Sequence, residues 1–353
     1  MKKKIRWMIR RVIRLWARRR RGGGFQTVLR PPRSIAYFAA GGIGDIVMTW
    51  PALKMLRETF PDARLDVFVP PKPYAIIREA FAGFNVCAAP STRLALGFVR
   101  RRYDCAFTNT IAVFSLAVEL NAYMASRQCW GFRYPDEPDN GRLFTATLPV
   151  ADTVHDIDQN CGLVSRAFGA GGAAPVFFYP RPHAAGPSAP VLIHPGAERG
   201  YEYKMWPLDR YQDICRRCAA AGHAVTVLLG PDEVHMRRFF EGMPSVDAAL
   251  SPPPSKLMEI MRTARLFVGN DSGPAHLAAF CGTAGITLIG PVDPKRSAPR
   301  GPHCVYIHNA VDCAPCHFKQ RQCADNRCMK SITVEQVWRE ISGLLQHTDE
   351  GIQ

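Results

Sequence analysis

Short apolar runs alternate with longer amphipathic stretches along most of the chain. Each run ends at glycine, proline or polar residues, which is typical of a strand buried on both faces. In the longer stretches apolar residues return every three or four positions, which is typical of a helix packed on one side. Regular alternation of the two patterns predicts an α/β protein with parallel sheets.

The alternation falls into two series, which predicts two domains. The first series opens with a strand at 34–40, a helix at 45–59 and a strand at 64–69, and it continues more weakly to about residue 180. A segment rich in proline, alanine and glycine follows, as is typical of a linker. The predicted boundaries are an N-terminal domain at 33–180, a linker at 181–190, a second domain at 191–331 and a final amphipathic helix at 332–347.

The second series repeats the same order of elements. Its predicted strands lie at 191–194, 224–229, 266–269 and 286–289. We expect the sheet to be complete after the last of these. Helices are predicted at 207–221 and from Pro274 onward, since proline is favoured in the first turn of a helix. Because Rossmann-like sheets bind ligands beyond the carboxyl ends of their strands, chemistry is expected in the loops that follow strands.

The N-terminus forms a basic arm at residues 1–24. Its first 21 residues carry eleven Lys or Arg and no acid, which accounts for most of the net charge of +15. Apolar residues at 5, 8, 9, 12, 13 and 16 share one face of a helix, so the arm could lie on an anionic membrane. A disordered basic tail is the alternative. A nucleic-acid partner is not expected, because the charge is confined to the arm.

Twelve cysteines are present, and most of them stand among apolar neighbours, as in a reducing cytoplasm. No apolar run is long enough to span a bilayer, and no secretory signal is visible. We therefore expect a cytoplasmic protein, with peripheral contact to the inner membrane through the arm. Four cysteines cluster at Cys313, Cys316, Cys323 and Cys328. Either a small metal site or thiols and disulfides that stabilise a loop would explain this density.

The first candidate site is the glycine-rich loop GGIGD at 41–45. Its glycines, Gly44 among them, let the backbone approach a ligand. A dinucleotide fingerprint would have a third glycine where Val47 stands, and an acid after the next strand, where prolines stand instead. Asp45 could act as a general base toward an acceptor hydroxyl. Alternatively, it is a helix N-terminal acid favoured by the helix dipole.

Two further loops of the second domain carry candidate residues. Gly196 directly follows a strand, and Lys204 stands shortly before the next predicted helix. A lysine in that position could hold a phosphate as a point charge, although a solvated surface lysine is the alternative. Glu233 follows the strand at 224–229. An acid there commonly accepts hydrogen bonds from ribose hydroxyls, and an exposed acid at a helix start is the alternative.

The most informative segment is GNDSGPAH at 269–276. A strand ends here and a helix begins at Pro274, so the free amides of the first helical turn could bind an anion. The polar and small residues around that turn are Asp271, Ser272, Gly273 and His276. This set is more polar than helix capping alone requires, and it predicts a site for a diphosphate.

Three ordered segments together resemble glycosyltransferase family 9, the ADP-heptose:lipopolysaccharide heptosyltransferases. They read GGIGDIVMTWPALKMLRETFPDARLDVFV, HPGAERGYEYKMWPLDRY and VGNDSGPAHLAAFCGTAGITLIGPVDP. The resemblance implies a GT-B fold, with two Rossmann-like domains whose parallel sheets face a central cleft. It also implies an inverting transfer without a cofactor or catalytic metal, from a nucleotide sugar such as ADP-heptose to lipopolysaccharide core or a related glycolipid.

The resemblance also assigns roles to individual residues. Asp45 matches the family's proposed base, and Gly44 and Gly196 belong to its loops. The positions that match donor-binding residues are Lys204, Glu233, Asp271, Ser272, Gly273 and His276. Glu198 departs from the pattern, because the family often has Ser or Thr there, and the arm lies outside the pattern. An NAD-type oxidoreductase and a sugar-nucleotide-binding protein without catalysis are the rival functions.

Overall fold

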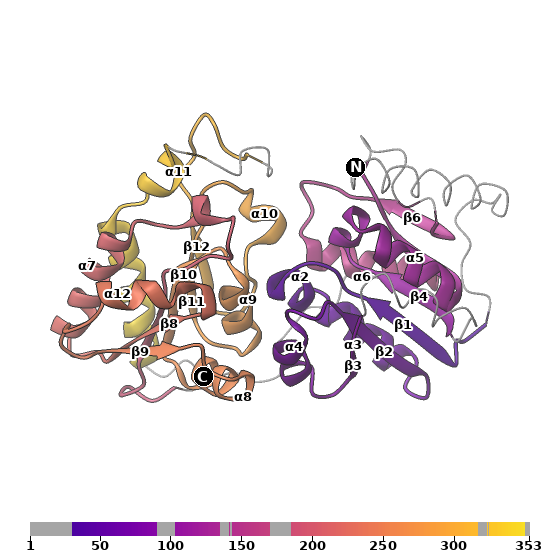
Figure 1. Ribbon diagram of the computed structural model, residues 1–353, viewed down its shortest axis with the longest axis horizontal. Coiled ribbons are helices and arrows are strands. Elements are labelled where there is room, and N and C mark those ends of the chain that lie inside the picture. Colours follow the sequence, from indigo (N-terminus) through magenta and orange to yellow (C-terminus); the bar gives the residue numbers. More distant parts are fainter. Residues whose placement is uncertain are drawn as a thin grey trace. The chain divides into compact units, whose positions relative to one another are not determined.

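The chain folds into two compact units, Met1–Phe177 and Phe178–Gln353, each of which is described by itself. The computed structural model describes residues 30–89, 103–134, 141, 143–169, 185–316, 323 and 325–349 (Figure 1). The predicted basic arm and part of the predicted linker lie outside these residues. No helix among the described residues is long and apolar enough to cross a membrane.

Unit 1 is built on a parallel sheet of six strands in the order β3-β2-β1-β4-β5-β6. This is the strand order of a Rossmann-like, doubly wound sheet, as the sequence pattern predicts. Its strands are β1 (Ser34–Phe38), β2 (Arg64–Val69), β3 (Asn85–Ala88), β4 (Tyr103–Thr108), β5 (Ser126–Arg133) and β6 (Ala146–Pro149). The order reverses between β1 and β4, so the loops that follow these two strands meet at one point of the sheet edge.

The helices of unit 1 connect these strands. They are α2 (Ile43–Val47), α3 (Trp50–Thr59), α4 (Tyr74–Ala80), the 3-10 helix η1 (Thr110–Phe114), α5 (Leu116–Ala125) and α6 (Asp156–Ala167). The expectation of one continuous helix at 45–59 is wrong, because the segment forms α2 and α3. Pro51 has no backbone N–H to donate to the carbonyl of Val47, so the helical hydrogen bonds stop and start again.

Unit 2 repeats the topology in the order β12-β11-β10-β7-β8-β9, again with every pair parallel. Its strands are β7 (Val191–His194), β8 (Val225–Leu229), β9 (Val246–Leu250), β10 (Leu266–Asn270), β11 (Gly285–Leu288) and β12 (Cys304–Ile307). The expectation that the sheet is complete after residue 289 is wrong, because β12 adds a sixth strand. This edge strand has four apolar residues, CVYI, but it is only partly buried, with Tyr306 48% exposed.

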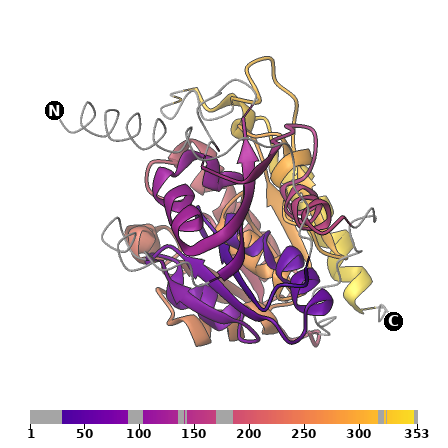
Figure 2. The same cartoon turned by 90° about the vertical axis from the view of Figure 1, so that its right-hand side faces the viewer.

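The helices of unit 2 pack on both faces of its sheet. They are η2 (Glu202–Lys204), α7 (Leu208–Ala220), η3 (Pro231–Phe239), α8 (Pro254–Thr263), α9 (Gly273–Phe280), α10 (Pro294–Ser297), α11 (Arg327–Lys330) and α12 (Val334–Asp349). The final helix α12 lies beside α7 against the sheet (Figure 1), and it is drawn in yellow in Figure 2.

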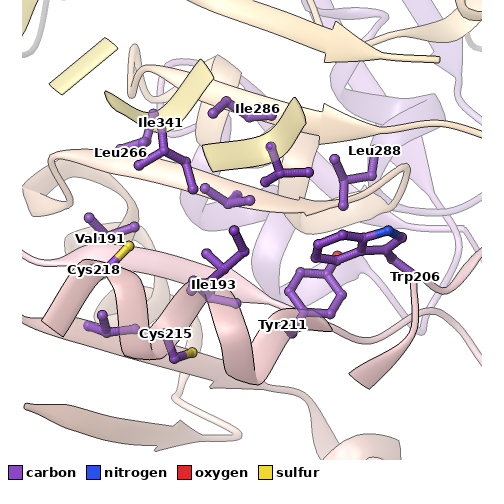
Figure 3. Close-up of a cluster of buried hydrophobic side chains, with 14 of the residues drawn as sticks. Val191, Ile193, Trp206, Tyr211, Cys215, Cys218, Leu266, Ile286, Leu288 and Ile341 are labelled. Carbon is purple, nitrogen blue, oxygen red and sulfur yellow. The ribbon is translucent and has the colours of Figure 1, made fainter. Parts of the chain in front are cut away.

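One large apolar core holds unit 2 together. Figure 3 shows Val191 and Ile193 of β7 beside Cys215 and Cys218 of α7. Leu266 of β10 and Ile286 and Leu288 of β11 belong to the same core. The indole of Trp206 closes one end of this core, with its ring 5.0 Å from that of Tyr211. Its Nε1 donates to the carbonyl of Ile332, 2.9 Å away. The segment before α7 is therefore fixed to the core, which places the neighbouring Lys204.

Candidate functional site

The sheet of unit 2 reverses its strand order between β7 and β10, and Asn270 lies at this point. It is the last residue of β10 and is fully buried. Its Oδ1 accepts hydrogen bonds from the Trp206 amide at 3.0 Å and the Tyr211 hydroxyl at 2.8 Å. Its Nδ2 donates to the carbonyls of Pro195 at 2.8 Å and Gly196 at 3.0 Å. One side chain thus fixes the loop after β7 and the start of α7 to the end of β10.

Lys204, Asp271 and His276 meet beside this asparagine. The Lys204 ammonium donates to Oδ2 of Asp271 at 2.7 Å, and Nε2 of His276 lies 3.9 Å from Oδ1. The side chains of Lys204 and Asp271 are only 15% and 7% exposed. Burial alone would raise the pKa of Asp271, but the neighbouring Lys204 and His276 outweigh it and hold this pKa well below its usual value. A carboxylate here lies between two cationic or protonatable groups.

Glu233 and Ser272 are joined through His194, the last residue of β7. Nε2 of His194 lies 3.2 Å from Oε2 of Glu233, and its Nδ1 lies 3.3 Å from the Ser272 hydroxyl. The Gly230 amide donates to the same Glu233 oxygen at 2.7 Å. Burial raises the pKa of Glu233, but the hydrogen bonds and charge around it lower the pKa overall. Gly196 is needed beside this carboxylate, because a Cβ there would overlap the Glu233 side chain.

The N-terminus of α9 is built for an anion. Ser272 occupies the N-cap position, yet its side chain makes no capping hydrogen bond to the helix. Its hydroxyl is directed to His194 instead. Gly273 begins the helix and Pro274, which has no N–H, follows it. The amides of Ala275 and His276 donate to the Ser272 carbonyl, so the Gly273 amide is the first-turn donor that can bind a phosphate oxygen.

In unit 1, Asp45 lies where the order reverses between β1 and β4. Its Oδ2 accepts a hydrogen bond from the Gly42 amide at 2.8 Å, so the carboxylate caps α2. Gly41 adopts a φ of +96°, and a Cβ there would overlap the Asp45 carboxylate. Gly44 is buried within α2. Asp45 is therefore an acid in the first turn of α2 with a half-buried side chain, and its role as a general base stays a prediction.

Asn109 fixes the first loop of unit 1 through side-chain hydrogen bonds, as Asn270 does in unit 2. It directly follows β4, the fourth strand of its sheet, and is 1% exposed. Its amide accepts from the Ala40 N–H at 3.0 Å and donates to the Ala40 carbonyl at 2.9 Å. A further contact joins its Nδ2 to the backbone carbonyl of Asp45 at 3.5 Å. The loop that carries Asp45 is therefore tied to the end of β4.

The structure brings the predicted residues of the second domain into one region around the ends of β7, β8 and β10. Sequence reasoning missed three buried residues that organise the loops: His194, Asn109 and Asn270. A signal was present, because His194 and Asn270 are polar residues at the ends of otherwise apolar strands, VLIH and LFVGN. Glu198, which departs from the resemblance, is exposed.

The four clustered cysteines do not form a recognisable metal site among the described residues. They are free thiols, with Cys313 exposed and Cys328 buried. Burial raises the pKa of Cys328, which belongs to the apolar core of unit 2. The role of the other three thiols stays a prediction.

A family model for glycosyltransferase family 9 (heptosyltransferase) matches residues 91–326. Lipopolysaccharide heptosyltransferase 1 of Pseudomonas aeruginosa is 25% identical over 315 residues, which are 78% of this chain and 83% of that protein. Lipooligosaccharide heptosyltransferase 2 of Campylobacter jejuni is 30% identical over 84 residues, and the chain spans only 26% of that protein's length there.

The structure of E. coli ADP-heptose lps heptosyltransferase II matches with a TM-score of 0.71 at 18% identity, over 90% of this chain and 99% of that one. This likeness confirms the predicted GT-B fold. The family match itself covers about two thirds of the chain, including every loop that contributes to the region of unit 2 described above. The chain therefore belongs to glycosyltransferase family 9, the heptosyltransferase family, and is a glycosyltransferase.

Proposed function

We propose that the protein transfers a heptose from ADP-heptose to lipopolysaccharide core or a related glycolipid, with inversion at the anomeric carbon. Membership of the heptosyltransferase family supports the sugar. The relatives named above act on lipopolysaccharide or lipooligosaccharide, which supports the acceptor class. The likeness to the E. coli ADP-heptose lps heptosyltransferase II supports ADP-heptose as the donor.

The observation that carries this proposal is the buried set of Lys204, Asp271 and His276 beside the N-terminus of α9. A nucleotide-sugar donor leaves as a diphosphate, and negative charge grows on that group as the sugar departs. Groups that stabilise charge in the transition state without reorganising are the most effective catalysts. The Lys204 ammonium lies 2.7 Å from the Asp271 carboxylate, which orients it.

The remaining donor contacts come from the same region. The Ser272 hydroxyl and the Gly273 amide would bind the diphosphate, and Glu233 beside Gly196 would accept from the ribose hydroxyls. Lys204 provides the positive charge in this scheme and His276 a further hydrogen bond, and we propose that no metal ion or cofactor takes part.

Asp45 is the proposed general base. Its carboxylate removes the proton from the acceptor hydroxyl while that oxygen attacks the anomeric carbon from the side opposite the leaving diphosphate, which inverts the configuration. A positioned base contributes about 10²–10⁴-fold to a rate. The hydrogen bond from Gly42 and the Asn109 contacts to its loop orient Asp45 for this role.

Residues 1–24 carry the proposed attachment to the membrane. These residues lie outside the described part of the chain, and their charge and apolar spacing are the support. A basic arm on the anionic surface of the inner membrane would bring a cytoplasmic enzyme to a lipid-linked acceptor.

A screen of nucleotide sugars tests the donor directly. ADP-heptose and ADP are expected to raise the melting temperature more than the UDP, GDP and CDP analogues, and only ADP-heptose should support transfer to a heptose-acceptor glycolipid. The Lys204→Met variant should lose the stabilisation by ADP. The matched control Lys256→Met removes a lysine whose ion pair is exposed, and it should keep the stabilisation. Preference for another nucleotide, or binding without any transfer, would contradict the proposal.

A further inference from the structure

His194 is a buried group that the proposed transfer chemistry does not use. It is 3% exposed, and both of its ring nitrogens are occupied. Nε2 faces the Glu233 carboxylate at 3.2 Å, while Nδ1 faces the Ser272 hydroxyl at 3.3 Å. The imidazole therefore links the proposed ribose acid to the proposed phosphate-binding hydroxyl.

The Glu233 carboxylate determines which ring nitrogen of His194 carries a hydrogen. The hydrogen bond from Gly230 and the contact with His194 help to lower the pKa of Glu233 despite its burial, so the group is ionised near neutral pH. An ionised carboxylate only accepts hydrogen bonds. Nε2 of His194 must therefore carry a hydrogen and donate it to Glu233. The remaining nitrogen, Nδ1, is bare in the neutral ring and carries a hydrogen in the charged ring.

The state of Nδ1 decides what the Ser272 hydroxyl can do. Opposite a neutral ring, the hydroxyl donates its hydrogen to Nδ1 and turns only lone pairs outward. Opposite a charged ring, Nδ1 donates to the hydroxyl oxygen, and the Ser272 hydrogen is free for another partner. Phosphate oxygens at neutral pH are chiefly acceptors, so they need the second arrangement.

We propose that His194 takes up a proton from solvent when a nucleoside diphosphate binds and returns it when the nucleotide leaves. The proton is added to Nδ1, and no bond between heavier atoms forms or breaks. This inference rests on the proposed function, because it requires the diphosphate to bind at the N-terminus of α9. It makes His194 a positioning residue that acts through Ser272.

Other charged groups neighbour this chain of contacts and have to be distinguished from His194. Glu233 and the exposed His235 come from η3, and His235 also acts on the Glu233 charge. Asp271 precedes Ser272, and it is balanced by Lys204 from η2 and approached by His276 from α9. His276 is thus the rival site for the proton, and His235 is a matched histidine outside the hydrogen-bonded chain.

Calorimetric titration with ADP tests the inference. The binding heat is measured in PIPES and in Tris at matched values between about pH 6.5 and 8.5, around the usual pKa range of histidine. A difference between the buffers that scales with their ionisation heats reports the protons taken up. The wild-type protein is expected to take up close to one proton per ADP at its maximum. His194→Gln should bind ADP with no uptake, whereas the matched control His235→Gln should retain it.

Ser272→Ala provides a second variant should His194→Gln fail to fold, since Ser272 is only partly buried. Removing the hydroxyl is expected to lower the proton uptake by more than half. The inference is overturned if wild-type protein binds ADP with equal heat in both buffers, or if His194→Gln or Ser272→Ala keeps the full uptake. Those results would leave the proposed function intact. Absence of ADP binding by folded wild-type protein would instead refute the proposed function, and the inference with it.

Discussion

At the scale of single residues, the region around α9 consists of buried charges that depend on one another. Asp271 is a carboxylate with 7% exposure that is stabilised as an anion by Lys204 at 2.7 Å. Such a pair contributes little by itself, because desolvation opposes the attraction between the charges. Removing one partner is costly, since a lone charge then stays buried. The pair is therefore better explained as an oriented binding group than as a source of stability.

The lowered pKa of Asp271 predicts a specific dependence of stability on pH. A carboxyl group with a folded-state pKa below its unfolded value, about 3.9 for Asp, stabilises the fold above that value. This contribution is lost as the pH falls below about 4 toward the folded-state pKa. The free energy of unfolding is measured in urea for wild type and Asp271→Asn between neutral and acid pH. It should fall less at acid pH in the variant than in the wild type. Parallel curves for the two proteins would contradict this.

Gly196→Ala is predicted to disrupt nucleotide binding although it adds only one methyl group. The new Cβ would overlap the Glu233 carboxylate and force it away from His194 and Gly230. Affinity for ADP, measured by titration, should fall by at least about tenfold, the effect of 1.4 kcal/mol. The control Gly343→Ala lies on α12 with open space around it, and it should leave ADP affinity unchanged. Equal affinities in all three proteins would be evidence against the Gly196 argument.

At the scale of elements, an asparagine at the end of the fourth strand fixes the first loop of each unit. Asn109 bonds to both backbone groups of Ala40, and Asn270 bonds to the carbonyls of Pro195 and Gly196. The first loop of a doubly wound sheet is the one that meets the ligand. The side-chain amides of Asn109 and Asn270 hold these two loops in place, although the loops are not paired with a strand.

Asn109→Ala is expected to lower the transfer rate constant more than it changes the donor KM. The substitution leaves the buried backbone groups of Ala40 without their partners, which costs about 1–3 kcal/mol for each group. The loop that carries Asp45 would then be less well oriented, while the donor residues in unit 2 are untouched. Steady-state kinetics with varied ADP-heptose, together with ADP titration, separate the two effects. A change confined to donor KM would contradict this role.

The strand-helix alternation and the loops after β1, β7 and β10 could be predicted because long periodic patterns and polar turns are local signals. The break before Pro51 was missed, although proline is a local signal against a continuous helix. Strand β12 was also missed, because it is a four-residue edge strand that is only partly buried, although its residues are apolar. The link from His194 to Glu233 and Ser272 depends on the direction of side chains from three separate elements. That direction is set by packing and not by local sequence.

At the scale of the whole molecule, the two units are separate sheets with the same strand order and their own buried cores. A ligand that binds only the folded state of one unit stabilises that unit. For ADP at about a hundred times its Kd this effect is about 2.7 kcal/mol. The donor residues predicted from sequence, apart from Gly44, all belong to unit 2.

Scanning calorimetry is therefore predicted to resolve two unfolding transitions, of which ADP raises one. The Lys204→Met variant should remove that shift, since its side chain is lost from the proposed diphosphate site. A single unfolding transition whose midpoint temperature rises with ADP would show that the two units unfold together. That result would contradict the prediction.

The most direct measurement of the central claim is a single-turnover transfer assay on Asp45→Asn with ADP-heptose and the glycolipid acceptor. Asparagine can still accept the hydrogen bond from Gly42, so the start of α2 should remain intact. The account predicts unchanged ADP affinity and a transfer rate lower by about 10²–10⁴-fold, because the base is gone. A variant that transfers heptose at nearly the wild-type rate would contradict it.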